Sequence, residues 1–208
     1  MKNVVDIQTR EILAPVDLSM QALRAAGRDV ASSLRQAGRA KPGRRVQDQV
    51  TRALELPKLW VGLRSVPTAV RATSDGLKCL RENKRLLNAV LEETKEAIKE
   101  LPDLPLARTS EQTPRPRAAV VAESFLRATG YQFEEGSAAA FLDGFQEFHQ
   151  LEMHELWALK PLLQLSLLAQ IGQTAKIVFR NPQHPYPELH EFIQSLRQVW
   201  EMEWRDYF

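Results

Sequence analysis

His154 and Glu155 begin a pattern that could bind a metal, because they reproduce the first half of an H-E-x-x-H zinc motif. The second imidazole is missing, since the position that should hold it is Ala158. His149 lies five residues before His154, and this spacing places the two rings on different faces of a helix. A zinc site needs three or four protein ligands that meet at one point. The sequence therefore predicts no metal site and no cofactor.

Paired carboxylates could hydrolyse a glycosidic bond, but such a pair needs a cleft and a raised pKa on one member. Neither requirement is visible in the sequence, so surface carboxylates are the default interpretation. The serines lack a G-x-S-x-G elbow, and no glycine-rich phosphate-binding loop is present. We therefore predict no catalytic and no cofactor-binding residues. The carboxylates considered are Glu134, Glu135, Glu152 and Glu155.

Tryptophan side chains could stack on sugar rings, and the chain has four of them. Trp157 lies in an almost uniformly apolar segment, which favours a place in the core over a sugar-binding role. Trp200 and Trp204 lie four residues apart near the end of the chain and could face a further part of the protein. The single cysteine, Cys79, excludes an internal disulfide and is expected to act as a small hydrophobic residue.

Charge is distributed unevenly along the chain. Residues 1–130 hold 23 Lys and Arg and 15 Asp and Glu, whereas residues 131–208 hold 5 and 11. We expect the basic part to dock on the acidic part or to stay solvated. Binding to an anionic lipid surface or to nucleic acid is the alternative.

A basic stripe concentrates this charge, with only Asp29 opposing it. It could engage phosphate or lipid head groups. No aromatic residues are interleaved with it, which makes a nucleic-acid partner unlikely on sequence grounds. The arginines of the basic stripe are Arg24, Arg28, Arg35, Arg39, Arg44 and Arg45, accompanied by Lys41.

The elements that must position these residues are expected to be helical. Leu, Ala, Glu, Gln, Arg and Lys are abundant and there are only 9 Gly, so we predict an all-α helical bundle without strands of note. Apolar spacing of three, four and seven residues indicates amphipathic helices. The expected helices cover about 7–37, short pieces of 44–72, 75–101, 120–128, a segment from 137, a buried central helix from 151, and 188–207.

A proline-rich segment, 102–117, separates two groups of helices and predicts a linker. Residues 1–101 would form a basic helical region with a long helical hairpin. Residues 118–208 would form an acidic helical subdomain, which we expect to be truncated at its C-terminus. No segment has the length and continuous apolar character of a membrane-spanning helix, and the start of the chain lacks a secretory signal, so a cytoplasmic location is expected.

Two stretches carry a resemblance to a known family. They are RENKRLLNAVLEETKEAIKELP (Arg81–Pro102) and the segment Ala118–Ile171. The second contains the ELWAL motif, defined here as Glu155, Leu156, Trp157, Ala158 and Leu159 together with Pro161. Lys160 stands between the motif's Leu and Pro, where the family usually has the two adjacent. These stretches resemble the N-terminal region of cyclic β-1,2-glucan synthase-like proteins, which combine a glycosyltransferase with a cellobiose-phosphorylase-like domain.

The resemblance implies a bacterial enzyme of the inner membrane that builds glucan from UDP-glucose. The machinery for that reaction would lie in other domains, so the chain would be a non-catalytic scaffolding or regulatory module on the cytoplasmic side, at the inner face of the membrane. Its partners would be downstream domains of the same polypeptide or a membrane glycosyltransferase. The alternative is a free-standing helical adaptor that binds an anionic membrane surface or nucleic acid through the basic stripe.

Overall fold

The computed structural model describes residues 19–41, 46, 56–108 and 113–203. This part of the chain is mainly helical, which confirms the predicted helical class, and it also contains a small sheet of three strands. The helices are α1 (Met20–Ser33), α3 (Leu56–Ser65), α4 (Thr68–Thr73), α5 (Asp75–Glu82), α6 (Lys84–Glu100), α7 (Arg117–Ala128), α8 (Glu135–Gln146), α9 (Met153–Arg180) and α10 (Pro187–Glu201), and the strands are β1 (Arg35–Ala40), β2 (Leu104–Arg108) and β3 (Arg115–Pro116).

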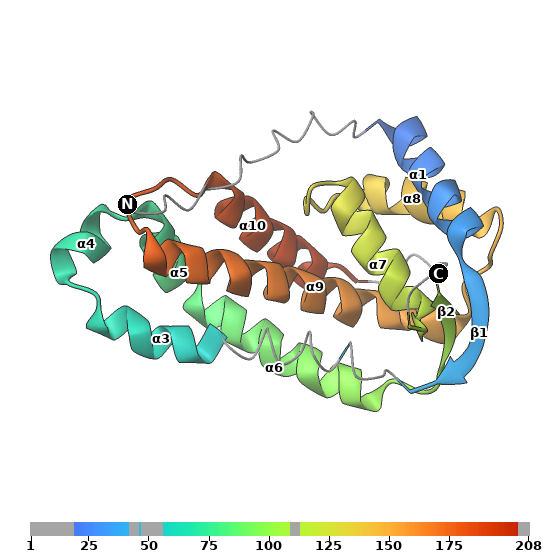
Figure 1. Ribbon diagram of the computed structural model, residues 1–208, viewed down its shortest axis with the longest axis horizontal. Coiled ribbons are helices and arrows are strands. Elements are labelled where there is room, and N and C mark those ends of the chain that lie inside the picture. The colour runs from blue at the N-terminus through green and yellow to red at the C-terminus, as the bar shows by residue number, and fades with distance from the viewer. Residues whose placement is uncertain (1–18, 42–45, 47–55, 109–112, 204–208) are drawn as a thin grey trace, which may run out of the picture.

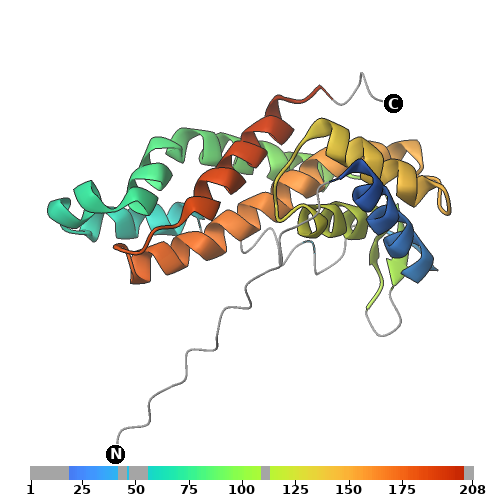
Figure 2. The same cartoon turned by 90° about the horizontal axis from the view of Figure 1, so that it is seen from above.

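Helix α9 forms the long axis of the molecule, and α3, α5, α6, α7 and α10 pack around it (Figures 1 and 2). Its leucine-rich sequence is buried on most sides, as predicted for the central helix. By length and composition α9 is the one helix of the described chain that could cross a membrane, but 72% of its most apolar window is buried inside the protein. Core helices of soluble proteins meet the same criteria.

The sheet corrects the expectation of an all-α fold without strands. β1 and β2 pair antiparallel, with Arg35 opposite Arg108 and Ala40 opposite Leu104, and β3 adds to the other side of β2. Gly38 has φ +92° and lies where the register of β1 is irregular, a conformation that glycine adopts without strain. Strands that form through pairing between distant segments leave little local signal, because strand preference depends on the neighbouring strand.

β2 and β3 lie inside the proline-rich segment 102–117, and residues 109–112 between them fall outside the description. Leu104 and Ala107 of β2 are buried in the hydrophobic core. That core is one continuous cluster that includes side chains from α6, α7, α9 and α10. The proline-rich segment therefore contributes buried residues as well as connecting the helices on its two sides.

The helix expected over 75–101 is divided in two. Asn83 ends α5, because its side-chain amide donates to the carbonyl of Cys79 at 2.9 Å, and α6 begins at Lys84. Asparagine competes with the helix for backbone hydrogen bonds in this way. The apolar spacing runs through the break because Leu80 and Leu87 both reach the same core.

Candidate functional site

Glu155 of the ELWAL motif forms a buried ion pair with Arg117. Arg117 Nε donates to Glu155 Oε1 at 2.9 Å and Nη2 donates to Oε2 at 2.5 Å, while Nη2 also donates to the carbonyl of Gln150 at 2.9 Å. Glu155 Oε2 additionally accepts the backbone N–H of Glu152 at 2.9 Å, and the two glutamates form a capping box at the start of α9. Both carboxylate oxygens of Glu155 are therefore bound by Arg117 or by the backbone of Glu152, and the side chain is fully buried. Glu155 holds α7 and α9 together at this junction and is not accessible to a substrate.

The remaining residues of the motif divide into a buried set and one exposed side chain. Leu156, Ala158, Leu159 and Pro161 are buried in the core. Trp157 is 60% exposed, so the prediction that it lies in the core is wrong. A helix that is apolar on all sides gives no periodic signal, and the side left uncovered is decided by where neighbouring helices end.

Trp157 has exposed apolar neighbours at this end of α9. Met153, one turn earlier on the same helix face, is 48% exposed, and Phe148 in the turn between α8 and α9 is 60% exposed. The ring of His154 lies edge-on to the indole, with 5.6 Å between the ring centroids. Proline has no backbone N–H, so Pro161 also deprives the carbonyl of Trp157 of its usual donor four residues later.

Three arginines of the basic stripe form ion pairs with carboxylates of the acidic C-terminal part, which is the docking that the charge distribution allowed. Arg24 and Arg28 of α1 both bind Glu147 just after α8, with N to O distances of 2.6 and 2.5 Å. Arg39 of β1 binds Glu152 at 2.7 Å. These pairs connect elements more than a hundred residues apart.

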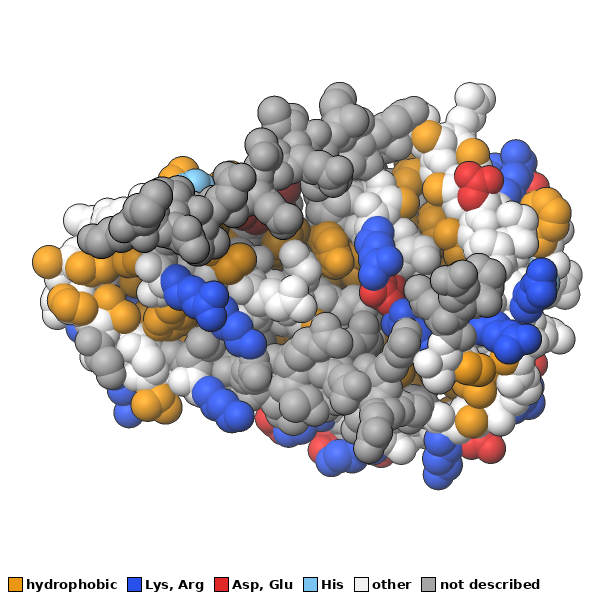
Figure 3. All heavy atoms as spheres, viewed as in Figure 1, with side chains coloured by type: hydrophobic (Ala, Val, Ile, Leu, Met, Phe, Trp, Pro, Cys, Tyr) orange, Lys and Arg blue, Asp and Glu red, His pale blue; other side chains and the backbone are white. Residues whose placement is uncertain are grey.

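The other members of the stripe stand apart from these pairs. Arg35 lies directly opposite Arg108 in the β1–β2 pairing, and neither forms an ion pair with a carboxylate of the described residues. Arg44 and Arg45 lie outside the described residues. On the face drawn in Figure 3, Lys and Arg side chains surround the end of the molecule that holds β1 and β2, whereas hydrophobic side chains gather at the opposite end around α3 and α4.

Hydrogen bonds from Arg28 and Arg24 lower the pKa of Glu147 from 4.5 to about 2. Because the folded-state pKa lies below the unfolded one, this interaction stabilises the fold fully above pH 4.5 and is lost as the pH falls toward 2. As the pH falls from 4.5 toward 2, we expect the free energy of unfolding to decrease less for a Glu147→Gln variant than for the unmodified protein. Urea unfolding at a series of pH values measures the difference. A normal pKa for the Glu147 carboxyl in an NMR titration would contradict these contacts.

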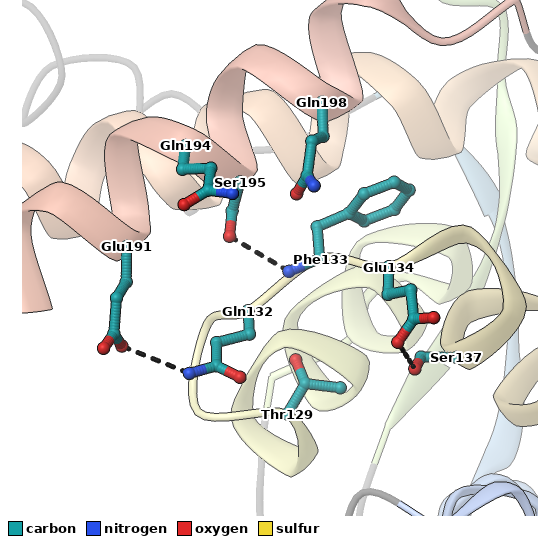
Figure 4. A pocket seen from close by; sticks show the side chains of 9 residues that line it. All are labelled: Thr129, Gln132, Phe133, Glu134, Ser137, Glu191, Gln194, Ser195 and Gln198. Carbon is teal, nitrogen blue, oxygen red and sulfur yellow. Dashed lines mark hydrogen bonds between the residues drawn. The ribbon is translucent and has the colours of Figure 1, made fainter.

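A polar cleft of about 370 Å³ lies between α10 and the turn that follows α7 (Figure 4). The Ser195 hydroxyl accepts the backbone N–H of Phe133 at 3.0 Å, and the Gln132 amide donates to Glu191 at 3.2 Å. Among the described lining residues there is no Lys, Arg, His or Cys, so this part of the cleft offers hydrogen-bonding groups without a histidine base beside Ser195. The lining residues are Thr129, Gln132, Phe133, Glu134, Ser137, Glu191, Gln194, Ser195 and Gln198.

The carboxylates considered for glycosidase chemistry divide among three environments. Glu134 lines the polar cleft and also an adjoining hollow, which Glu135 lines as well. Glu152 pairs with Arg39 at the surface, and Glu155 is buried against Arg117. The described structure therefore does not bring these four side chains together in one cleft.

Cys79 is buried beside a hollow that His190 also lines. Burial raises the pKa of the thiol to about 11, with smaller contributions from the charges of Asp75 and Glu82. The thiol is therefore protonated at neutral pH and is a poor nucleophile. His190 Nε2 instead lies 2.9 Å from Asp75 Oδ2. Among the described residues, no group of three or more His, Cys, Asp and Glu side chains could hold a metal ion.

Two features of this region were missed by sequence reasoning. Arg117 is the partner of Glu155, but 38 residues separate them and no local pattern connects them. The exposed face of α9 did have a signal, since Met153 and Trp157 are four residues apart. That signal could not be distinguished from the apolar residues on the other faces of the same helix.

No family model, no curated protein and no solved structure matches this chain.

Proposed function

We propose that this chain is a non-catalytic helical scaffolding or regulatory module of a larger assembly, and that its α9 helix presents Trp157 at an outward-facing docking surface. One observation carries the proposal: every other residue of the ELWAL motif is buried, whereas Trp157 faces outward. The buried residues hold the helix in place, which leaves the indole as the part of the motif that can contact a partner. Exposed tryptophan is costly in water and is enriched at interfaces.

The titratable groups of the described residues support a role without catalysis. Glu155 is satisfied by Arg117 and by the capping box, and the Cys79 thiol is protonated at neutral pH. The polar cleft provides amide, hydroxyl and carboxylate groups suited to binding rather than to nucleophilic attack. These properties fit a module that positions other domains.

The parent protein, in this proposal, is a bacterial cyclic β-1,2-glucan synthase-like glycosyltransferase, on the strength of the ELWAL motif and its flanking helices. Glucan would be made from UDP-glucose by domains other than this one. The partners would be downstream domains of the same polypeptide or a membrane glycosyltransferase, reached from the cytoplasmic side at the inner face of the membrane. The division into 1–101, a linker at 102–117, and 118–208 is part of the same proposal, with β2 and β3 inside the linker segment.

The coding sequence downstream of Phe208 tests this proposal directly. We expect the reading frame to continue into membrane-spanning segments and a glycosyltransferase region with a D-x-D metal-binding motif. A stop codon at that point would overturn the assignment. It would favour the second candidate, a free-standing adaptor for anionic partners. That candidate is supported by Arg35 and Arg108, which lie opposite each other without a carboxylate partner among the described residues.

A further inference from the structure

The structure brings three arginines of the basic stripe and three exposed apolar side chains to one region, which we term the α8–α9 corner. Glu147 directly precedes exposed Phe148 and binds Arg24 and Arg28 of α1. Glu152 directly precedes exposed Met153 and binds Arg39 of β1. The corner therefore consists of Phe148, Met153 and Trp157 bordered by Arg24, Arg28 and Arg39.

We propose that the α8–α9 corner docks on the surface of an anionic lipid bilayer, with Trp157, Met153 and Phe148 entering the interfacial layer. Indole rings favour the boundary between head groups and acyl chains, where an apolar ring and a polar N–H are both accommodated. Neighbouring basic side chains add attraction to anionic head groups. The corner supplies both the apolar side chains and the basic side chains. The ELWAL motif alone would supply only the former, and the basic stripe alone only the latter.

Charge around the corner favours an anionic surface over a neutral one. Residues 19–41 carry five basic side chains and one acidic side chain, and Glu147 and Glu152 at the corner offset two of the five positive charges. The arginines paired to Glu147 and Glu152 remain 45 to 50% exposed, so their guanidinium groups can still reach head groups. Arg35 and Arg108 lie opposite each other on β1 and β2, and like charges in that position are destabilising unless an anion compensates them.

A bilayer accounts for the corner better than nucleic acid does. Nucleic acid would use the arginines but would leave the three apolar side chains without a role, because Met and Phe contribute little to contacts with a phosphate backbone. This inference does not depend on the proposed glucan synthase relationship, since it rests on the contacts and exposure at the corner.

Sedimentation of the full chain with vesicles tests the inference. The vesicles contain phosphatidylcholine and phosphatidylglycerol in equal parts, and vesicles of phosphatidylcholine alone serve as the neutral comparison. We expect binding to the mixed vesicles, weakened about tenfold by Trp157→Ala because the apolar area of one large side chain is lost. Reversing Arg35 and Arg108 to glutamate should weaken binding by at least about tenfold, since each basic residue near the surface contributes severalfold.

Ile177→Ala is the matched control. Ile177 is 52% exposed on the same helix, and it lies 20 positions after Trp157, which places it about 30 Å away along the axis. This variant should bind as the unmodified protein does. Circular dichroism of each variant checks that the fold is retained, which the exposure of Trp157 leads us to expect.

Four results would overturn the inference. They are no binding to the mixed vesicles, equal binding to the neutral vesicles, equal binding by Trp157→Ala, and full competition by soluble glycerophosphoglycerol. The last result would indicate a site for a free phosphate rather than for a membrane surface. Tryptophan fluorescence gives an independent measure. When mixed vesicles are added, the emission of the unmodified protein should shift to shorter wavelength, and this shift should be absent in Trp157→Phe.

Discussion

Replacing Glu155 with alanine should destabilise the fold by about 3 to 5 kcal/mol, because the charge of Arg117 would remain buried without its partner. Arg117 is only 4% exposed and Glu155 is fully buried. The variant also loses the side chain that accepts the backbone N–H of Glu152. Urea unfolding monitored by circular dichroism measures the change in free energy.

Two comparisons separate this effect from a general loss of charge. Glu96 pairs with Lys99 on α6, but both side chains are 63% exposed, so Glu96→Gln should leave the free energy of unfolding almost unchanged. Replacing both buried partners, Arg117→Met with Glu155→Leu, should recover most of the stability lost in Glu155→Ala, since no buried charge remains. Equal effects of Glu155→Ala and Glu96→Gln would show that the Arg117 pair is not buried in solution.

Local sequence information was sufficient where a single segment determined its own structure. The aliphatic content of Leu151–Ile171 predicted the buried central helix, and the segment 44–72, expected as short helical pieces, contains α3 and α4 among its described residues. The charge difference between the two parts of the chain allowed docking or solvation of the basic part, and Arg24, Arg28 and Arg39 form ion pairs with the acidic part. Each of these predictions depends on composition or on spacing within one segment.

Features that depend on contacts between distant segments could not be predicted in the same way. The pairing of β1 with β2 joins residues such as Ala40 and Leu104, and neither segment has alternating apolar residues. The exposure of Trp157 depends on which neighbouring helices extend past the start of α9. The candidate site was therefore recognised by sequence as a motif, whereas its one outward-facing residue became evident only in the folded chain.

Gly27 on α1 and Gly144 on α8 let the two helices approach until their backbones touch. A Cβ added at Gly27 would clash with the carbonyl oxygen of Phe141 and lie 2.8 Å from the backbone nitrogen of Phe145. A Cβ at Gly144 would meet the backbone carbonyl of Arg24 in the same way. Backbone atoms cannot move aside as a flexible side chain can, so the helices would have to separate.

Gly27→Ala should therefore destabilise the protein by about 3 kcal/mol, at the upper end of the range for overpacked contacts. Separation of α1 from α8 should also remove Arg24 and Arg28 from Glu147, so the pKa of Glu147 should rise from about 2 toward 4.5. Urea unfolding measures the first effect, and an NMR titration of the Glu147 carboxyl measures the second. Faster amide hydrogen exchange confined to α1 and α8 would locate the change.

Gly62→Ala on α3 is the matched substitution with the opposite expected sign. The nearest atom to a Cβ at Gly62 is Cε1 of Phe179 at 3.7 Å, which is an ordinary contact. Alanine should then stabilise the helix by about 0.5 to 1 kcal/mol, because it restricts the unfolded chain without straining the folded one. A stabilising effect of Gly27→Ala similar to that of Gly62→Ala would contradict the close crossing. A destabilising effect of Gly27→Ala together with a raised pKa of Glu147 would instead establish that the glycine contact holds Arg24 and Arg28 in place. These two arginines would then owe their position at the α8–α9 corner to the packing of α1 on α8.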